Sequence, residues 1–132
     1  MMKKAFVVLF VFLFLVGCAS GSAQLDIKDN GLPGQIKTIV FSDDNKNGVM
    51  DPGEPGFPDR VQISPENSCP PSNLENVTYA DTDTNGEMTF KDLEPGPYCV
   101  AYAGSVSTTT KLAITVFLSS EQEAVVVFGV SD

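Results

Sequence analysis

Residues 43–54 (DDNKNGVMDPGE) hold acidic and amide side chains at the spacing of a calcium-binding loop. Every specified position of the pattern D-x-[DN]-x-[DN]-G-x5-E is matched, and Gly48 stands where the pattern requires a sharp turn. Calcium takes roughly six to eight oxygen ligands, which carboxylates, carboxamides and one backbone carbonyl can supply. The expected ligands are the side chains of Asp43, Asn45, Asn47, Asp51 and Glu54 and the carbonyl oxygen of Val49. The alternative is a solvated acidic loop in which Asn47-Gly48 forms an ordinary hairpin turn.

A partial copy of this pattern begins at Asp81, where the residues read DTDTNG and Asp92 stands at the twelfth position. A hairpin turn centred on Asn85-Gly86 explains these residues better than a calcium loop does. The open alternative is that these carboxylates complete a second cation site near the first.

The composition of the chain limits the chemistry that it can perform. The chain has 132 residues, a formal net charge of -9 and neither histidine nor tryptophan. Because histidine is the commonest general base and a common ligand of zinc and copper, we expect no catalytic residues and no enzymatic activity. The excess of carboxylates repels phosphate backbones, so we expect no nucleic-acid partner, whereas divalent cations are favoured.

The candidate calcium loop lies between two predicted strands. The preceding residues, 35–42 (QIKTIVFS), are rich in β-branched and aromatic side chains, which favour a strand. After the loop, Pro55, Gly56 and Pro58 exclude a helix, because proline lacks an amide donor and its ring clashes with the preceding turn. The loop therefore connects strands and not helices.

Further strands are predicted from alternating hydrophobicity and from turn residues at 60–64, 76–80, 87–90, 98–102, 109–118 and 124–130. Segments 76–80 and 87–90 should pair as an antiparallel hairpin. In 98–102, Tyr98, Val100 and Tyr102 share one face, so Cys99 lies on the other. With about seven strands and no helical periodicity, the predicted fold is all-β, an antiparallel seven-stranded β-sandwich.

Residues 1–17 have the features of a signal peptide. Lys3 and Lys4 precede an apolar run too short for a membrane-spanning helix, which needs about 20 residues, and the run ends in LVGC. LVGC resembles the bacterial lipobox, which implies lipidation of Cys18 and a membrane anchor. Residues 18–34 then form a flexible tether and 35–132 one domain, outside the cytoplasm on the bacterial cell surface or outer membrane. The alternative is ordinary secretion with Cys18 free.

The two remaining cysteines, Cys69 and Cys99, would reach an oxidising compartment after export. We expect them to form a disulfide. The alternative is a pair of free buried thiols.

Three stretches together resemble the SdrD B-like domain of bacterial surface proteins, a prealbumin-like relative of the Cna B-type sandwich. They are FSDDNKNGVMDPGEPGFPDRVQI, TDTNGEMTFKDLEPGPYCV and VVVFGV, and the resemblance extends over most of residues 36–130. It implies calcium held by the acidic loop, with the ligands named above, and a role in stiffening stalks or in adhesion. Related sandwiches often contain a Lys–Asn isopeptide bond. Lys37 is suitably placed, but residues 124–130 contain no Asn or Asp, so we expect no such bond.

These observations predict a calcium-stabilised, non-catalytic surface lipoprotein domain for adhesion or cell-envelope structure. Its expected partners are the membrane, through the lipid, and a host, matrix or envelope protein or a glycan. The alternative is a carbohydrate or small-ligand binding module of the carboxypeptidase-regulatory-like type, which would need exposed aromatic side chains.

Overall fold

The computed structural model describes residues 30–132. This part of the chain contains eight β-strands and one 3-10 turn. The strands are β1 (Gly34–Ser42), β2 (Arg60–Ser64), β3 (Thr78–Asp81), β4 (Glu87–Leu93), β5 (Gly96–Tyr102), β6 (Ser107–Thr108), β7 (Ala113–Leu118) and β8 (Glu123–Ser131), and the turn is η1 (Leu74–Asn76). Within these residues no helix has the length and the hydropathy needed to cross a membrane. The predicted signal peptide and the lipidation site at Cys18 lie outside the described residues.

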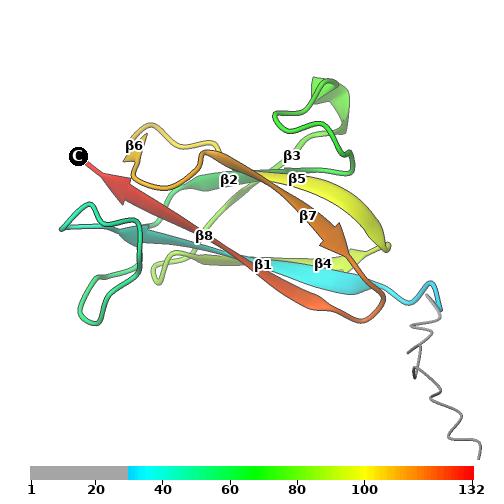
Figure 1. The fold of residues 1–132 in the computed structure, drawn as a ribbon, viewed down its shortest axis with the longest axis horizontal. Helices are drawn as coiled ribbons and strands as arrows, with labels where there is room; N and C mark the ends of the chain where they lie inside the picture. Colours follow the sequence, from blue (N-terminus) through cyan, green and yellow to red (C-terminus); the bar gives the residue numbers. More distant parts are fainter. Residues whose placement is uncertain (1–29) are drawn as a thin grey trace, which may run out of the picture.

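The strands form two four-stranded sheets that pack face to face as a sandwich (Figure 1). Sheet A has the strand order β4-β1-β8-β6 and sheet B the order β3-β2-β5-β7. The predicted all-β sandwich is confirmed, with eight strands in place of seven. The added strand is β6, which lies just before the predicted strand 109–118. Residues 109–112 of that predicted strand are irregular, and only 113–118 form β7.

Two predicted features of strand pairing were wrong. β1 and β8 pair in parallel, with residues 35–42 opposite residues 123–130, so sheet A is mixed and not wholly antiparallel. The predicted hairpin does not form, because β3 pairs with β2 in sheet B while β4 pairs with β1 in sheet A. Thr82 donates its amide to Asp59 O at 2.8 Å, which keeps the chain beside sheet B until the turn at Asp83–Gly86 leads it to sheet A.

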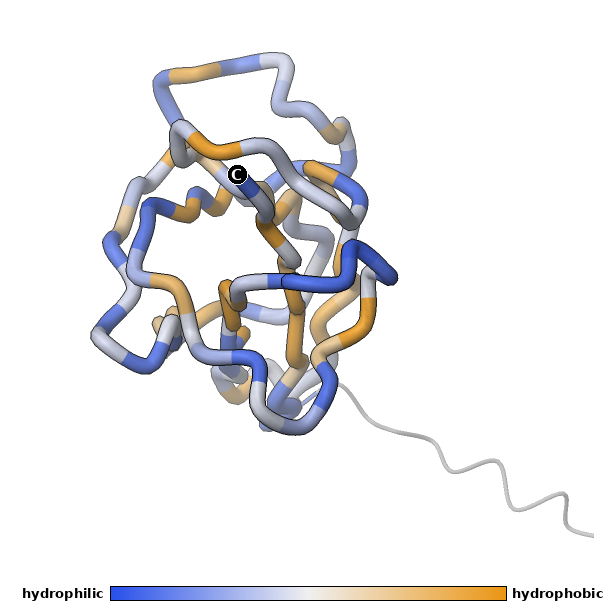
Figure 2. Tube along the Cα trace, turned by 90° about the vertical axis from the view of Figure 1, so that its left-hand side faces the viewer, coloured by the Kyte–Doolittle hydropathy of each residue, from blue (hydrophilic) through white to orange (hydrophobic). Residues whose placement is uncertain are grey.

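Side chains that alternate along the strands fill the space between the sheets. The buried apolar cluster contains Ile36, Val40, Val61, Ile63, Phe90, Tyr98, Val100, Tyr102, Leu118, Val126, Phe128 and Val130. The prediction that Tyr98, Val100 and Tyr102 share one face is confirmed by their common burial in this cluster. The hydropathy colouring of the trace shows hydrophobic stretches through the middle of the domain, and the outlying segments are mainly hydrophilic (Figure 2).

The predicted disulfide between Cys69 and Cys99 is confirmed, with an Sγ–Sγ distance of 2.01 Å and a Cα–Cα distance of 5.2 Å. It ties the long loop after β2 to the outer side of β5. Since the bond joins residues 30 positions apart, its closure of the chain stabilises the fold by about 3 to 4 kcal/mol.

β1 sets the long axis of the domain. It runs from the end where the described chain begins to the opposite end, where residues 43–54 and the C-terminus lie (Figure 1). We call these the proximal end and the distal end. A strand of nine residues spans about 30 Å, so the candidate calcium loop is held well away from Gly34, where β1 begins.

Tyr102 fastens the β5 end to the loop before β2. Its hydroxyl donates to Asp59 Oδ2 at 2.5 Å and accepts from the Val106 amide at 3.2 Å. Burial, followed by the hydrogen bond to Asp59, raises the pKa of Tyr102 to about 12 from its ordinary 10.0. The folded protein therefore favours the neutral phenol.

We predict that Tyr102 contributes stability that is complete below about pH 10 and is lost as the pH rises to about 12, because its folded pKa lies above its unfolded pKa. Tyr102→Phe should lower the unfolding free energy near pH 7 by about 1 to 3 kcal/mol and remove this alkaline loss. Denaturant unfolding between pH 8 and pH 12 measures both, with Tyr79→Phe as the control at a 54% exposed tyrosine. Parallel stability curves for wild type and Tyr102→Phe above pH 10 would refute the assignment.

Candidate metal site

The candidate calcium loop leaves the distal end of β1 and is closed at its base by backbone hydrogen bonds. Ser42 donates its amide to Pro55 O at 2.9 Å, and Asp43 donates to Val130 O at 2.8 Å. An isolated bridge pairs Phe41 with Gly56. The loop is therefore attached both to its own strand and to the end of β8.

Asp43 is fully buried at the base of the loop. Its Oδ1 accepts from the Asn47 amide at 3.1 Å, and its Oδ2 accepts from the Gly48 amide at 2.7 Å. Burial raises the pKa of Asp43, but the neighbouring Thr109 hydroxyl and the amides of Gly48, Asn47 and Lys46 outweigh it, so the pKa lies below its ordinary value. The loop backbone thus stabilises Asp43 as a carboxylate.

The other expected ligands face amide donors. Asn45 and Asn47 both donate their side-chain amides to Asp51 Oδ2, at 2.8 and 2.6 Å. Glu54 accepts from the Asp44 amide at 3.1 Å through Oε1 and from the Asp51 amide at 2.8 Å through Oε2. These contacts gather the predicted side chains into one loop.

Val49 remains at the tip of this loop. Its side chain is exposed, and its amide donates to Asn47 Oδ1 at 2.9 Å. Only its carbonyl oxygen was predicted as a ligand, so the exposed side chain does not conflict with that prediction.

The donor set fits a hard cation in chemistry. Four carboxylates, Asp43, Asp44, Asp51 and Glu54, lie in this loop, and the two ion pairs among residues 30–132, Lys37–Glu87 and Arg60–Asp81, lie elsewhere. No three His, Cys, Asp or Glu side chains in the described part of the chain are grouped so that they alone hold a metal. A cation here therefore needs the carboxamide oxygens of Asn45 and Asn47 as well.

Thr109 is a neighbour of Asp43 that the sequence did not indicate. Its hydroxyl oxygen is buried and has no well-directed hydrogen bond within residues 30–132. It belongs to the connection between β6 and β7 and lies 66 positions from Asp43. No local pattern could have identified it, since the contact depends on how the two sheets pack.

The second acidic motif forms a turn, although the turn does not close the predicted hairpin. Asp83 Oδ1 accepts from the amides of Asn85 and Glu87, at 2.9 and 3.0 Å. Asp92 lies near the far end of β4, about five residues along an extended strand and so roughly 17 Å from Glu87. These residues therefore do not enclose a second cation.

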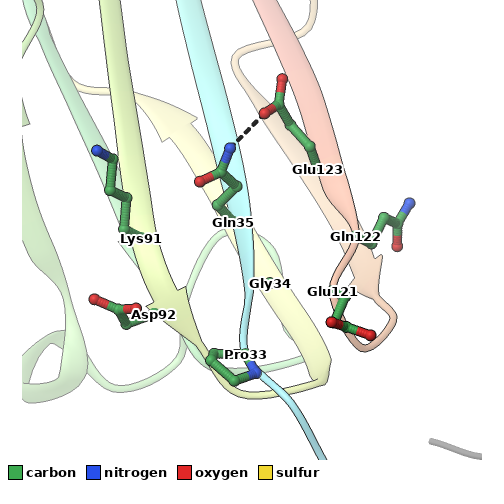
Figure 3. Close-up of a pocket in the computed structure, with 8 residues that line it drawn as sticks. All are labelled: Pro33, Gly34, Gln35, Lys91, Asp92, Glu121, Gln122 and Glu123. Atoms are coloured by element: carbon green, nitrogen blue, oxygen red, sulfur yellow. Dashed lines mark hydrogen bonds between the residues drawn. The ribbon is translucent and has the colours of Figure 1, made fainter.

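A polar pocket of about 360 Å³ lies at the proximal end (Figure 3). Its lining residues are Pro33, Gly34, Gln35, Lys91, Asp92, Glu121, Gln122 and Glu123. Gln35 donates to Glu123, whereas Lys91 and Asp92 lie on the other side of β1 from Glu121 and Glu123. Because these groups do not converge on one point, the pocket has no site comparable to the loop.

Two glycines permit a close backbone contact at the base of the candidate loop. A Cβ on Gly56 would lie 1.9 Å from Asn85 O, and one on Gly86 would lie 2.0 Å from Val40 O. Gly53, in the same loop, has φ +92° and nothing within 4 Å of its Cβ position.

We predict that Gly56→Ala lowers the unfolding free energy by about 3 kcal/mol or more, because the methyl group meets backbone that cannot move independently. Gly53→Ala should cost only about 1 to 2 kcal/mol, the strain of a left-handed residue. Denaturant unfolding with a calcium chelator compares the two variants. Equal losses would show that the base of the loop is not tightly packed.

A sequence profile of the SdrD B-like domain matches residues 34–125. Among curated proteins, Colossin-A of Dictyostelium discoideum is 40% identical over 67 residues, which are 50% of this chain and 1% of that protein. The chain thus spans only a very small part of that relative.

Among solved structures, a streptococcal ancillary pilin is similar, with a TM-score of 0.57 and 14% identity over 77% of this chain and 33% of that one. The major pilin subunit of Bacillus cereus has a TM-score of 0.54 and 13% identity, over 76% and 30% of the two chains. At these identities the likeness concerns the fold, which agrees with the predicted prealbumin-like sandwich. The profile match covers most of the chain, and the chain therefore belongs to the SdrD B-like domain family.

Proposed function

We propose that the chain is a calcium-stabilised, non-catalytic surface lipoprotein domain that serves in adhesion or cell-envelope structure. The observation that carries this proposal is the loop of residues 43–54, which gathers four carboxylates and two carboxamides. Its one basic residue, Lys46, is in neither of the ion pairs among residues 30–132. Amide hydrogen bonds do not neutralise the charge of these carboxylates, so the carboxylates still repel one another, and a divalent cation removes that repulsion.

Calcium in this loop would act on structure. Asp43, Asn45, Asn47, Asp51 and Glu54 would hold it through side-chain oxygens, with the Val49 carbonyl. Because Asp43 is also bonded to Val130 O, an ion bound there would fasten the loop to the ends of both β1 and β8. A calcium ion when bound supplies charge neutralisation and no reaction step.

A surface role is supported by the family and by the direction of the chain. The domain begins at its proximal end, so a lipid on Cys18 would place that end toward the membrane and the candidate loop away from it (Figure 1). The partners that we propose are the membrane, through this lipid anchor, and a host, matrix or envelope protein or glycan at the exposed loops. The net charge of -9 disfavours nucleic acid.

The arrangement of exposed aromatic side chains does not favour the alternative of a carbohydrate-binding module. Tyr79 and Phe117 are 54% and 68% exposed, and they lie on β3 and β7, the opposite edges of sheet B. With β2 and β5 between them, these strands are about 14 Å apart. Two aromatic rings at that separation do not form a shared platform for one sugar ring.

We predict that calcium raises the melting temperature of the wild-type protein. At millimolar calcium and a dissociation constant of about 10⁻⁴ to 10⁻³ M, mass action gives about 0.4 to 1.4 kcal/mol, or a rise of roughly 2 to 10 °C. Glu54→Gln should remove most of this rise. It should also lower the calcium-free melt slightly, because the new amide meets one of the amide donors now bonded to Glu54.

Asn47→Asp should enlarge the rise in melting temperature that calcium causes, whereas Glu54→Gln should reduce it. The pair of variants therefore distinguishes a calcium site from an acidic turn. Without calcium it places a carboxylate against Asp51 and destabilises the loop, whereas with calcium it adds a charged ligand and enlarges the rise. Glu75→Gln, a carboxylate outside the loop, should behave as wild type. If wild type melts at the same temperature in calcium and in chelator, and Asn47→Asp gains nothing from calcium, the loop is an acidic turn.

A further inference from the structure

We propose that β7 is a self-association surface, through which two copies of this chain pair their β7 strands antiparallel into one continuous sheet. β7 is the last strand of sheet B and pairs with β5 on one side only. This inference is independent of calcium and concerns the side of the sandwich, not its distal end.

The open edge of β7 presents a regular row of backbone groups. The backbone amide of Tyr102 donates to Leu112 O. Because backbone groups alternate in direction along an antiparallel ladder, the N–H and C=O groups of Ile114 and Val116 also point toward β5. The N–H and C=O groups of Ala113, Thr115 and Phe117 then point outward. Such a row is a template for an extended strand.

β7 lacks the protection that the other edge strands have. Charged residues occupy β4 (Glu87, Lys91 and Asp92), β3 ends in Asp81, and β6 has two residues. By contrast, residues 112–120 and 124–131 contain no charge in a chain of net charge -9. Two copies therefore approach along this side with the least repulsion, whereas natural edges are usually blocked by charge, proline or a bulge.

The neighbouring strand β8 continues this side of the sandwich into sheet A, and after Glu123 its residues carry no charge. β6 pairs with β8 only at Val130 and Ser131, so residues 123–128 of β8 have a strand on one side only. The short turn 119–122 joins β7 to β8, and Phe117 and Val125, on either side of it, are 68% and 53% exposed. Each sheet thus carries an exposed apolar side chain on its outer face near this turn.

The sequence of β7 is self-complementary in one register. If the two-fold axis passes through Thr115, the outward-pointing residues of one copy meet those of the other. Thr115 then lies opposite Thr115, and the exposed Phe117 ring lies over the small side chain of Ala113 in the second copy. Threonine pairs and aromatic side chains over small neighbours are favourable across antiparallel strands. The occupant that fits this edge is therefore a second β7.

The first test is sedimentation of the full chain in a mild detergent over a range of concentrations. We expect a dimer for wild type and for Thr115→Val, which keeps the backbone amide. Thr115→Pro should weaken dimerisation roughly 30-fold, since it removes an outward amide from each copy and so two hydrogen bonds from each dimer. Among residues 30–132 the ladder directs that amide away from β5, so the melting temperature of diluted Thr115→Pro should stay near that of wild type. Phe117→Lys gives a second disruptive variant that keeps the amide.

The second test is cross-linking, which reports the register itself. Thr115→Cys should give a reducible dimer, because paired residues across such a ladder have Cα atoms about 5.5 Å apart. Wild type, which retains its own cysteines, gives the background, and Thr78→Cys on the opposite edge of sheet B is the matched control. A monomeric wild type at all concentrations, a Thr115→Pro variant that dimerises as strongly, or equal cross-linking at 78 and 115 would overturn the proposal.

Discussion

The distal end of the domain depends on the buried carboxylate of Asp43. A buried charge is tolerated only when hydrogen bonds or an opposite charge compensate its lost hydration, and here the amides of Asn47 and Gly48 do so. The same residue donates its own amide to Val130, at the end of β8. The shape of the loop and the end of the β1–β8 pair are thus set by one residue, through its side chain and its backbone amide respectively. A cation on the outer carboxylates would reinforce an arrangement that the backbone already favours.

The parallel pairing of β1 with β8 determines what each part of the surface can do. Both strands run from the proximal end to the distal end, so the described chain begins at one end and finishes at the other (Figure 1). The disulfide and the Tyr102–Asp59 hydrogen bond fasten the loops around this pair from the side of sheet B. The acidic loop 43–54 occupies the distal end, while the strand β7 carries no charge. A surface suited to cations is thus separate from one suited to another copy of the chain.

Strand positions and turns, which depend on local residues, could be predicted from the sequence. Strand pairing and burial could not, because they depend on segments that are distant in the sequence. β2 lies at 60–64 as predicted, and the calcium-loop spacing correctly placed a turn at Gly48 with φ +75°. Asn85-Gly86 signalled a turn, but its neighbours could not show that the turn crosses from one sheet to the other. The parallel β1–β8 pairing joins segments nearly 90 residues apart, and the burial of Asp43 beneath Thr109 follows from the same long-range packing. Neither has a local signal in the sequence.

The central claim is that calcium binds within residues 43–54, and a calcium titration followed by amide NMR shifts tests it most directly. The Gly48 amide, bonded to Asp43 Oδ2, should shift in a saturable way with a midpoint of about 10⁻⁴ to 10⁻³ M. The Glu75 amide, which makes a similar bond to Asn73 Oδ1 in the disulfide-linked loop, should stay unchanged. Extracellular calcium sites have dissociation constants up to about the millimolar range. The account would therefore be contradicted if the Gly48 amide did not shift up to several millimolar calcium, or if Gly48 and Glu75 shifted equally.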